Sequence, residues 1–228
     1  MEDVDAPRSV VGADRLILDT LEAFGMVSDE PVLYQSTRTA AYEAALERLK
    51  QMGAAYPCSC SRKDVGEGPY AGTCRSGPKE PGRPLSWRVR FDEAASSEKA
   101  SGEKALGDFV VRRSDGLFSY QLAVVVDDAA QGITHVVRGA DLLKSTPWQN
   151  RLHGLLGYPI PQYRHIPLVT NEAGEKLSKQ TGAEPIDPAR APELLREALR
   201  FLGQPESSDQ SSGETAREIL QAATLVWR

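Results

Sequence analysis

The sequence predicts an α/β fold built on a largely parallel sheet. Segments with the apolar spacing of helices alternate along the chain with short apolar runs that are typical of strands. With 228 residues, 40% of them hydrophobic, the chain is long enough to bury a sizeable core. We expect one main domain over residues 1–190, with an irregular insert at about 57–84, and a C-terminal helical extension over residues 191–228.

Two helices are expected near the N-terminus. Apolar side chains within residues 16–24 recur at helical spacing, and Gly25 supplies a common C-terminal stop. A second helix is expected to be capped by Ser36 or Thr37 and to end at Gly53. The residues predicted to form its inner face are Tyr42, Ala45, Leu46, Leu49 and Met52.

The next part of the chain is predicted to be irregular. Residues 57–84 are dense in Gly, Pro and Cys and show neither helical nor strand periodicity, so this insert needs something to hold it in shape. Ser86–Phe91 alternates apolar with polar or basic residues, which predicts a half-buried strand. Residues 92–108 are small and charged, a composition typical of a mobile surface loop.

Strands and helices alternate in the remainder of the chain. Strands are expected at residues 109–113, 133–137 and 164–169, while the apolar run 122–126 fits either a buried strand or a buried helix. Thr146 and Pro147 predict the start of a helix that continues through Leu156. After these come, in order, a turn at 171–174, an amphipathic helix around 194–202, a linker at 204–215 and a last helix from Ala216.

Composition limits the class of protein. No apolar run approaches the ~20 residues of a membrane helix, and the start MEDVDAPR lacks the pattern of a signal peptide. Three cysteines are too few for a disulfide scaffold, so reduced thiols or a metal site fit better. The net charge of -5 indicates no general affinity for polyanions, although basic residues gathered on one face would still bind RNA. We expect a cytoplasmic protein.

All three cysteines lie inside the irregular insert. Thiolates suit zinc, and a structural zinc site normally has four ligands. Cys58 and Cys60 form a Cys-x-Cys pair, Cys74 follows after a loop, and Tyr70 is our candidate for the fourth ligand. The competing fourth ligands are Asp64, Glu67 and water. The plainer interpretation is that the cysteines are ordinary small apolar residues.

Residues 175–182 form a lysine-rich stretch after a predicted strand. Lys176 and Lys179 lie three apart, with a serine between them and a glycine after. Such charges suit a phosphate chain whose negative charge shifts during a reaction. A solvated surface turn is the alternative interpretation of the same pattern.

Several motifs in order resemble the class I aminoacyl-tRNA synthetases. KLSKQ at residues 176–180 resembles their KMSKS signature, and residues 119–157 are similar to the substrate region of glutamyl-tRNA synthetases. The start MEDVDAPR resembles the E-D-x-D that follows the second strand of that fold. The C-x-C-x9-Y-x3-C pattern of the insert and residues 165–187 resemble one branch, the glutamyl-queuosine tRNA(Asp) synthetases. The resemblance covers about residues 1–203.

The resemblance implies a Rossmann-like class I catalytic domain with a zinc-binding insert and a two-step reaction. L-glutamate and ATP, supplied with Mg2+, give glutamyl-adenylate, and the glutamyl group then passes to queuosine in the anticodon of tRNA(Asp). Glu2, Tyr120 and Arg138 match positions that bind L-glutamate, and Lys179 matches the lysine that contacts ATP, with Lys176 beside it in the catalytic loop. The implied zinc ligands are Cys58, Cys60, Tyr70 and Cys74. We expect a monomer without a membrane partner.

The family begins with a strand and a helix that carry a HIGH-like motif, whereas this sequence opens almost on E-D-x-D. We therefore expect an N-terminally truncated catalytic domain that binds ATP poorly and has little activity. Two rivals stay open: a fragment of a true glutamyl-tRNA synthetase, and a non-catalytic, zinc-stabilised RNA-binding paralogue.

Each site residue also has a plainer interpretation. Glu2 would then be a frayed terminal charge, Tyr120 a half-buried core aromatic, Arg138 a surface ion-pair partner and Lys179 a solvated turn residue. The pair at residues 127–128 is interpreted as caps of a helix or turn rather than as metal ligands.

Overall fold

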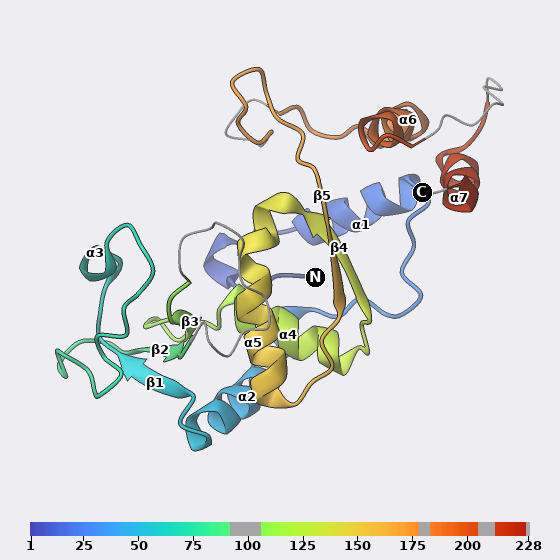
Figure 1. Ribbon diagram of the computed structural model, residues 1–228. Coiled ribbons are helices and arrows are strands. Elements are labelled where there is room, and N and C mark those ends of the chain that lie inside the picture. The colour runs from blue at the N-terminus through green and yellow to red at the C-terminus, as the bar shows by residue number, and fades with distance from the viewer. Residues whose placement is uncertain (92–105, 178–182, 205–212, 227–228) are drawn as a thin grey trace. The chain divides into compact units, whose positions relative to one another are not determined.

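The structure, a computed structural model, describes residues 1–91, 106–177, 183–204 and 213–226 (Figure 1). The chain divides into two compact units. Unit 1 comprises Met1–Arg8 and Tyr34–His165, and unit 2 comprises Ser9–Leu33 and Ile166–Arg228. This division differs from the boundary expected at residue 190, and the division into a catalytic domain and a helical extension stays a prediction.

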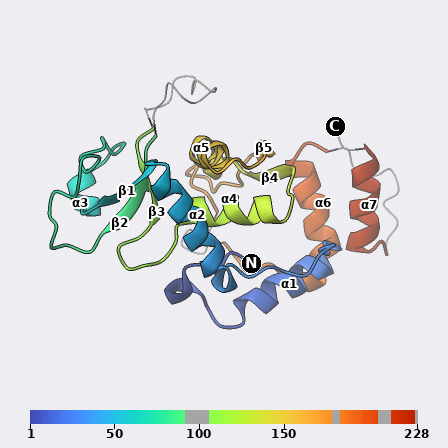
Figure 2. The same ribbon diagram turned by 90° about the horizontal axis from the view of Figure 1, so that it is seen from below.

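Three helices form the centre of unit 1. They are α2 (Thr39–Gln51), α4 (Tyr120–Ala130) and α5 (Thr146–Leu156), which contact one another in pairs. Figure 2 shows them grouped beside the strands of the same unit. Leucine and valine side chains at their interface are fully buried, which is the main source of stability because apolar area leaves water there. The best-buried of these are Leu46, Leu49, Leu122, Val125 and Leu152.

The larger sheet of unit 1 is antiparallel. It consists of β1 (Ala55–Cys58), β2 (Ser86–Val89) and β3 (Phe109–Arg112) in the order β1-β2-β3. The predicted largely parallel sheet is therefore wrong for these strands. The physical reason is that parallel neighbours need a crossover such as a helix, and the described residues between β1 and β2 contain only the four-residue helix α3.

A second, two-stranded sheet pairs β4 (His135–Gly139) with β5 (Gln162–Ile166). The 3-10 helix η4 (Ala140–Ser145) and α5 lie between these strands in the chain. The short elements that complete unit 1 are η1 (Ala6–Arg8), η2 (Gln35–Thr37) and α3 (Arg62–Val65).

Unit 2 is mainly helical. Its helices are α1 (Ala13–Ala23), η6 (Pro188–Arg190), α6 (Ala191–Phe201) and α7 (Ala216–Val226). A small core forms where α6 and α7 meet, and it contains Ala191, Leu195, Ala216 and Ile219. Residues 169–177 fold back on themselves, since Leu177 donates a backbone hydrogen bond to the Val169 carbonyl. Among the described helices, none has the length and apolar character that crossing a membrane requires.

Most predicted helices are confirmed, with corrections at their ends. Gly25 and Gly53 follow α1 and α2 with positive φ angles, as expected for helix stops. Neither predicted cap of α2 is right, because Ser36 binds the Asp3 carboxylate and Thr37 donates to the Tyr34 carbonyl. Met52, predicted on the inner face of α2, is 51% exposed because it lies beyond the last turn.

The strand predictions are confirmed in part. The ambiguous run 122–126 is helical, while the strands expected at 133–137 and 164–169 lie at 135–139 and 162–166. The insert is not wholly irregular, because Ser61 and Asp64 cap each other and start the short helix α3. Most of the predicted mobile loop and of the linker at 204–215 lies outside the described residues.

Candidate functional site

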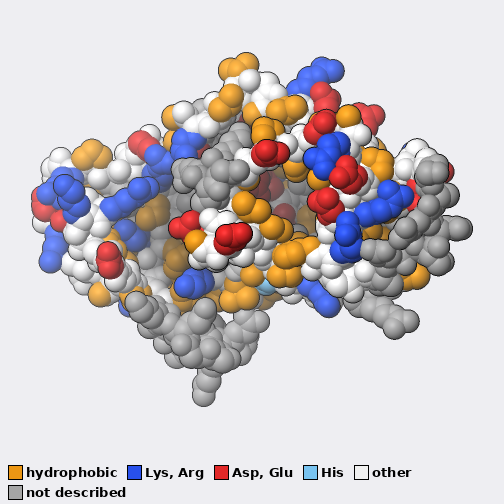
Figure 3. All heavy atoms as spheres, turned by 90° about the horizontal axis from the view of Figure 1, so that it is seen from above, with side chains coloured by type: hydrophobic (Ala, Val, Ile, Leu, Met, Phe, Trp, Pro, Cys, Tyr) orange, Lys and Arg blue, Asp and Glu red, His pale blue; other side chains and the backbone are white. Residues whose placement is uncertain are grey.

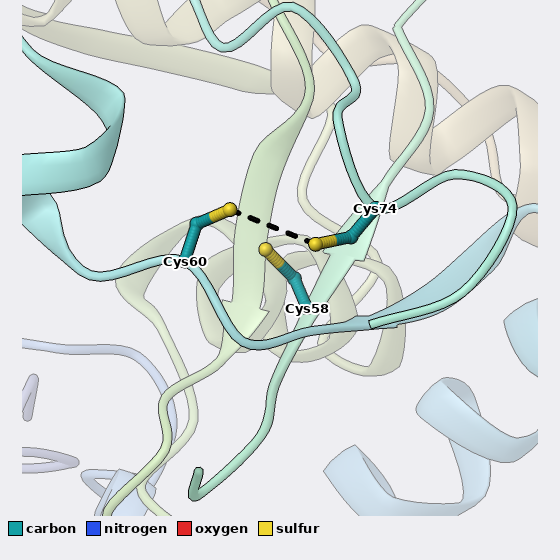
Figure 4. Close-up of side chains that lie close together, drawn as sticks. All are labelled: Cys58, Cys60 and Cys74. Carbon is teal, nitrogen blue, oxygen red and sulfur yellow. Dashed lines mark hydrogen bonds between the residues drawn. The ribbon is translucent and has the colours of Figure 1, made fainter. Parts of the chain in front are cut away.

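The three cysteines of the insert converge on one point. Cys58 ends β1, Cys60 follows it, and Cys74 returns from the loop beyond α3, so that the sulfur atoms all lie within 4.8 Å of one another. Figure 4 shows the three side chains pointing toward one another. The Sγ atoms of Cys60 and Cys74 are 3.6 Å apart. Sulfur ligands of a tetrahedral zinc ion with bonds of about 2.3 Å stand about 3.8 Å apart, so this donor set fits zinc.

Tyr70 lies where a fourth ligand would be placed. Its hydroxyl oxygen is 3.3 Å from Cys58 Sγ and 3.4 Å from Cys60 Sγ, and it accepts a hydrogen bond of 2.9 Å from the Cys74 backbone N–H. Of the competing ligands, Asp64 is engaged elsewhere, because its carboxylate accepts from Ser61 and pairs with Arg83. Among the described His, Cys, Asp and Glu residues, the metal-type group contains the three cysteines without Asp64 or Glu67.

The surroundings of the cluster modify its acidity. Burial raises the pKa of the Cys74 thiol, but hydrogen bonds from Tyr70 and from the backbone of Lys79 and Ser59 outweigh it and bring the pKa to about 6. Burial, with hydrogen bonding to the thiols, raises the pKa of the Tyr70 phenol. The Arg88 guanidinium stacks 4.1 Å above the centre of the Tyr70 ring. A cation bound among these groups would offset the cost of keeping them as anions.

An ion pair fastens the cluster to the sheet. Arg75, the residue after Cys74, donates to both oxygens of Asp108 at 2.7 and 2.6 Å. The Asp108 side chain is fully buried and also accepts from the Tyr56 hydroxyl and the Phe91 backbone N–H. Asp108 belongs to the stretch expected as a surface loop, and that expectation is wrong for it, because four donors compensate its burial.

A second group of polar residues surrounds Arg138 on β4. Its guanidinium donates to Gln149 Oε1 at 2.7 Å, to Thr146 Oγ1 at 2.8 Å and to His165 Nε2 at 3.3 Å. It also lies 4.6 Å from the centre of the Tyr163 ring. All four partners are uncharged side chains, and no carboxylate of the described residues lies within ion-pair distance of Arg138. The interpretation of Arg138 as a surface ion-pair partner is therefore wrong within the described residues.

Glu2 and Tyr120, the two other residues predicted to bind with Arg138, belong to the same neighbourhood. Burial raises the pKa of Tyr120, and the negative charge of Glu2 raises it further. Arg138 and Gln149, which lie beside the hydroxyl, lower this pKa in part. Burial also raises the pKa of Glu2, opposed by the N-terminus and by Arg138. The structure thus brings Glu2, Tyr120 and Arg138 together in unit 1.

The segment that carries Glu2 is fastened to the body of unit 1. Gln35 donates a backbone hydrogen bond of 3.1 Å to the Met1 carbonyl, and Ser36 donates two to the Asp3 carboxylate. Glu2 keeps part of its surface in contact with solvent, but it is not on a frayed end. These contacts hold its carboxylate near Arg138.

The acidic pair at the end of α4 has two different environments. Asp127 is buried and accepts from Arg38 at 3.1 Å and from the Tyr42 hydroxyl at 2.6 Å, so it links helices and does not cap one. Asp128 is half-buried, and burial, with the charges of Glu2 and Asp127, raises its pKa to about 6.

The lysine loop is described only in part. Lys176 is exposed and forms an isolated bridge with Thr170 across the turn at 171–174. Lys179 lies outside the described residues. Arg138 lies in unit 1 and Lys176 in unit 2, and their position relative to each other stays a prediction.

Sequence reasoning missed the partners of Arg138. Gln149 and Thr146 lie on α5, and His165 lies on β5. The sequence contains a signal of buried polar contacts only at Gln149 and His153, two polar residues on the apolar face of a predicted helix.

The insert and the strand that follows it are more basic than the rest of the chain. Residues 57–91 contain seven Lys and Arg against three Asp and Glu, a net charge of +4 in a chain whose total is -5. Figure 3 shows Lys and Arg side chains on the side of the view where the insert lies, and others on the opposite side. Arg62 and Lys63 on α3 are exposed there.

Comparison with known proteins gives consistent matches. The family model described as tRNA synthetases class I (E and Q), catalytic domain, matches residues 1–105 and 84–211. Proteins named Glutamyl-Q tRNA(Asp) synthetase are similar to this chain: that of Thiobacillus denitrificans is 48% identical, covering 100% of this chain and 80% of the relative. The protein of Dechloromonas aromatica is 53% identical, covering 90% and 74%, and that of Neisseria gonorrhoeae is 46% identical, covering 100% and 82%.

Solved structures agree at the level of the fold. A glutamate tRNA ligase from Elizabethkingia meningosepticum, in complex with its amino acid, superposes with a TM-score of 0.64 at 23% identity. The glutamate-tRNA synthetase of Elizabethkingia anophelis gives a TM-score of 0.66 at 23% identity. Each match covers 94% of this chain and 49% of the other, so the chain spans about half the length of these structures.

Proposed function

The chain belongs to the class I tRNA synthetases for glutamate and glutamine, among the glutamyl-Q tRNA(Asp) synthetases, and on that premise we propose that it activates L-glutamate with ATP and transfers it to queuosine in tRNA(Asp). In the first step a carboxylate oxygen of glutamate attacks the α-phosphorus of ATP and pyrophosphate leaves. In the second, the acyl group passes from the adenylate to a hydroxyl of queuosine, and AMP leaves.

The observation that carries the proposal is the group around Arg138. A guanidinium without a carboxylate partner among the described residues is suited to a two-pronged contact with a carboxylate of L-glutamate. Glu2 would bind the ammonium group, and the Tyr120 hydroxyl would donate to an oxygen of the substrate. In this proposal the three residues orient glutamate, and orientation is a large part of catalysis in such a reaction.

We assign the phosphate contacts to the lysine loop. Lys179 would offset the negative charge that grows on the departing pyrophosphate of Mg2+-bound ATP, with Lys176 beside it. Neither lysine needs to carry a proton, because in-line attack at phosphorus depends mainly on positioning and on charge stabilisation.

We assign a structural zinc ion to Cys58, Cys60, Tyr70 and Cys74. The sulfur separations and the position of the Tyr70 hydroxyl support this assignment. The ion would hold the insert in shape, and the basic residues of the insert would then attract the phosphate backbone of the tRNA. A cytoplasmic location and a monomeric state stay predictions.

The first step is tested by glutamate-dependent exchange of pyrophosphate into ATP, with aspartate and glutamine as comparison amino acids. The Arg138→Ala variant is expected to lose exchange by at least about 100-fold, because a charged contact to the substrate is removed. Arg164→Ala, at an exposed position on β5, is the matched control and is expected to retain it. Equal rates in the two variants would remove Arg138 from the glutamate site.

The second step is tested by transfer of labelled glutamate to tRNA(Asp) with and without queuosine. Labelling of queuosine-containing tRNA(Asp) alone is the expected result. Labelling of tRNA(Glu) instead would favour a true glutamyl-tRNA synthetase. Binding of RNA without any labelling, together with no binding of L-glutamate, would favour the non-catalytic paralogue.

A further inference from the structure

The hydrogen bonds of Arg138 assign a role to a residue that lies behind it. Gln149 on α5 is fully buried, and its side-chain oxygen accepts from Arg138 Nη1 at 2.7 Å. A buried glutamine has to satisfy both ends of its amide. Because a guanidinium only donates, the end of Gln149 that faces Arg138 has to be the oxygen.

The opposite end of the amide continues the chain of contacts. Gln149 Nε2 donates to Gln121 Oε1 at 3.0 Å, and Gln121 Nε2 donates to Ser145 Oγ at 2.9 Å. With its oxygen on Arg138 and its nitrogen on Gln121, the Gln149 amide is held at both ends. The position of the Arg138 guanidinium is fixed in turn.

The other contacts of Arg138 are neutral as well. Thr146, which is buried, accepts at 2.8 Å, and the Leu142 carbonyl accepts at 3.5 Å. His165 can accept from Arg138 Nε only as a neutral ring, and burial, together with the charge of Arg138, lowers its pKa. The hydrogen-bond partners of Arg138 named here are therefore all neutral, and the Glu2 and Asp128 carboxylates act on it from beyond ion-pair distance.

A buried carboxylate at position 149 would orient Arg138 equally well, but it would also neutralise it. We propose that Gln149 is a positioning residue that holds Arg138 for a carboxylate of L-glutamate through a neutral hydrogen bond and so preserves its affinity for an anion. This role rests on the proposed function, because the anion is the amino acid substrate of that reaction. Gln149 itself need not touch the substrate.

The test compares two substitutions in the intact 228-residue chain, purified in the presence of zinc. Gln149→Met removes the acceptor for Arg138, while Gln149→Glu keeps an acceptor and adds a negative charge. In Gln149→Glu the Gln121 amide can turn over, so that its nitrogen donates to the new carboxylate. L-glutamate affinity, measured by titration calorimetry, is expected to fall about tenfold in Gln149→Met and about 100-fold in Gln149→Glu. Gln51→Glu, an exposed glutamine at the end of α2, makes the same charge change and is expected to bind like the parent.

Stability against urea separates this role from a merely structural one. Gln149→Glu is expected to be at least as stable as Gln149→Met, because it retains the contact to Arg138, although it binds more weakly. If Gln149 had only a structural role, the variants would rank in the same order by stability and by affinity for L-glutamate. Affinity in Gln149→Glu equal to that of the parent would overturn the proposal, and so would affinities that follow stability across the variants.

Nitrogen-15 spectra of the arginine side chains measure the positioning without ligand. The Arg138 Nη groups are expected to rotate slowly in the parent and in Gln149→Glu, and faster in Gln149→Met. Equal rotation rates in all three would refute the positioning. A parent chain that shows held Arg138 groups but binds no L-glutamate would overturn the proposed function, and with it the substrate assigned to this residue.

Discussion

Replacing Asp108 by Asn is expected to lower the free energy of unfolding of unit 1 by about 3 kcal/mol. The carboxylate is fully buried and receives two hydrogen bonds from Arg75, at 2.7 and 2.6 Å, besides those from Tyr56 and the Phe91 backbone. Charged hydrogen bonds contribute about 1.5–3 kcal/mol each. When the pair is broken, the partly exposed Arg75 regains contacts with water, so the loss is smaller than the sum of these hydrogen bonds. The Asn amide group, in contrast, has to face one of the donors.

The matched control is Asp115→Asn. Asp115 also pairs with an arginine, Arg113, but both side chains are well exposed, so the change is expected to be under about 1 kcal/mol. Urea unfolding followed by tryptophan fluorescence measures both variants, since Trp87 and Trp148 lie in unit 1. An effect of Asp108→Asn no larger than that of Asp115→Asn would refute the reasoning.

The pH dependence provides a second measurement on the same pair. Burial raises the pKa of Asp108, but the hydrogen bonds from Arg75, Phe91 and Tyr56 outweigh it and hold the pKa below its ordinary value. The unfolded chain therefore takes up the proton first as the pH falls. The stabilisation is complete above the ordinary pKa of about 3.9 and is lost as the pH falls through the lowered folded value. Asp108→Asn should lack this part of the acid dependence.

Three further predictions concern other parts of unit 1. Metal analysis should find one zinc per chain, and Tyr70→Phe should weaken zinc by about tenfold or more in a chelator competition. Gly107→Ala should lower the free energy of unfolding in urea by about 2 kcal/mol or more, because the new Cβ would lie 2.5 Å from the Tyr70 backbone nitrogen. The control is Gly154→Ala on α5, whose new Cβ meets nothing within 4 Å, and it should raise the free energy of unfolding by up to about 1 kcal/mol. His153 is 1% exposed, and burial lowers its pKa. The free energy of unfolding should therefore decrease as the pH falls below about 6.5, where the unfolded chain gains the proton and the folded chain does not. His153→Met should make this decrease with pH less steep.

Each of these has a result that contradicts it. Zinc affinity in Tyr70→Phe equal to that of a Tyr158→Phe control would leave the fourth ligand to water. Equal stabilities of the two glycine variants would mean that the backbone near residue 70 yields without cost. For the histidine, a slope that changes as much in the exposed His135→Gln variant as in His153→Met would point to a general charge effect.

The features that the sequence could predict are those with local causes. Glycine stops end α1 and α2 where expected, and three cysteines in one insert indicated a cluster that the structure brings within 4.8 Å. The family resemblance is confirmed by relatives at 46–53% identity. Such signals depend on residues close together in the chain, where spacing and conformation are directly related.

The features that could not be predicted depend on distant partners. Asp108 looked like part of a surface loop because its partner Arg75 lies 33 residues earlier. Gln149 gave no reason to be paired with Arg138, since the contact requires α5 to pack behind β4. The antiparallel order of β1, β2 and β3 was missed because the alternation of helices and strands describes connections and not directions.

The insert has two separate attachments, the proposed zinc site and the ion pair of Arg75 with Asp108. Because Arg75 directly follows Cys74 and holds Asp108, and Cys58 ends a strand that pairs with β2, both ends of the cysteine loop stay fixed when zinc is withdrawn. Only the short stretch between Cys60 and Cys74 is then released. Reloading becomes the closure of one small loop and not the refolding of a domain, so an apoprotein exposed to a chelator should recover quickly when the ion is returned.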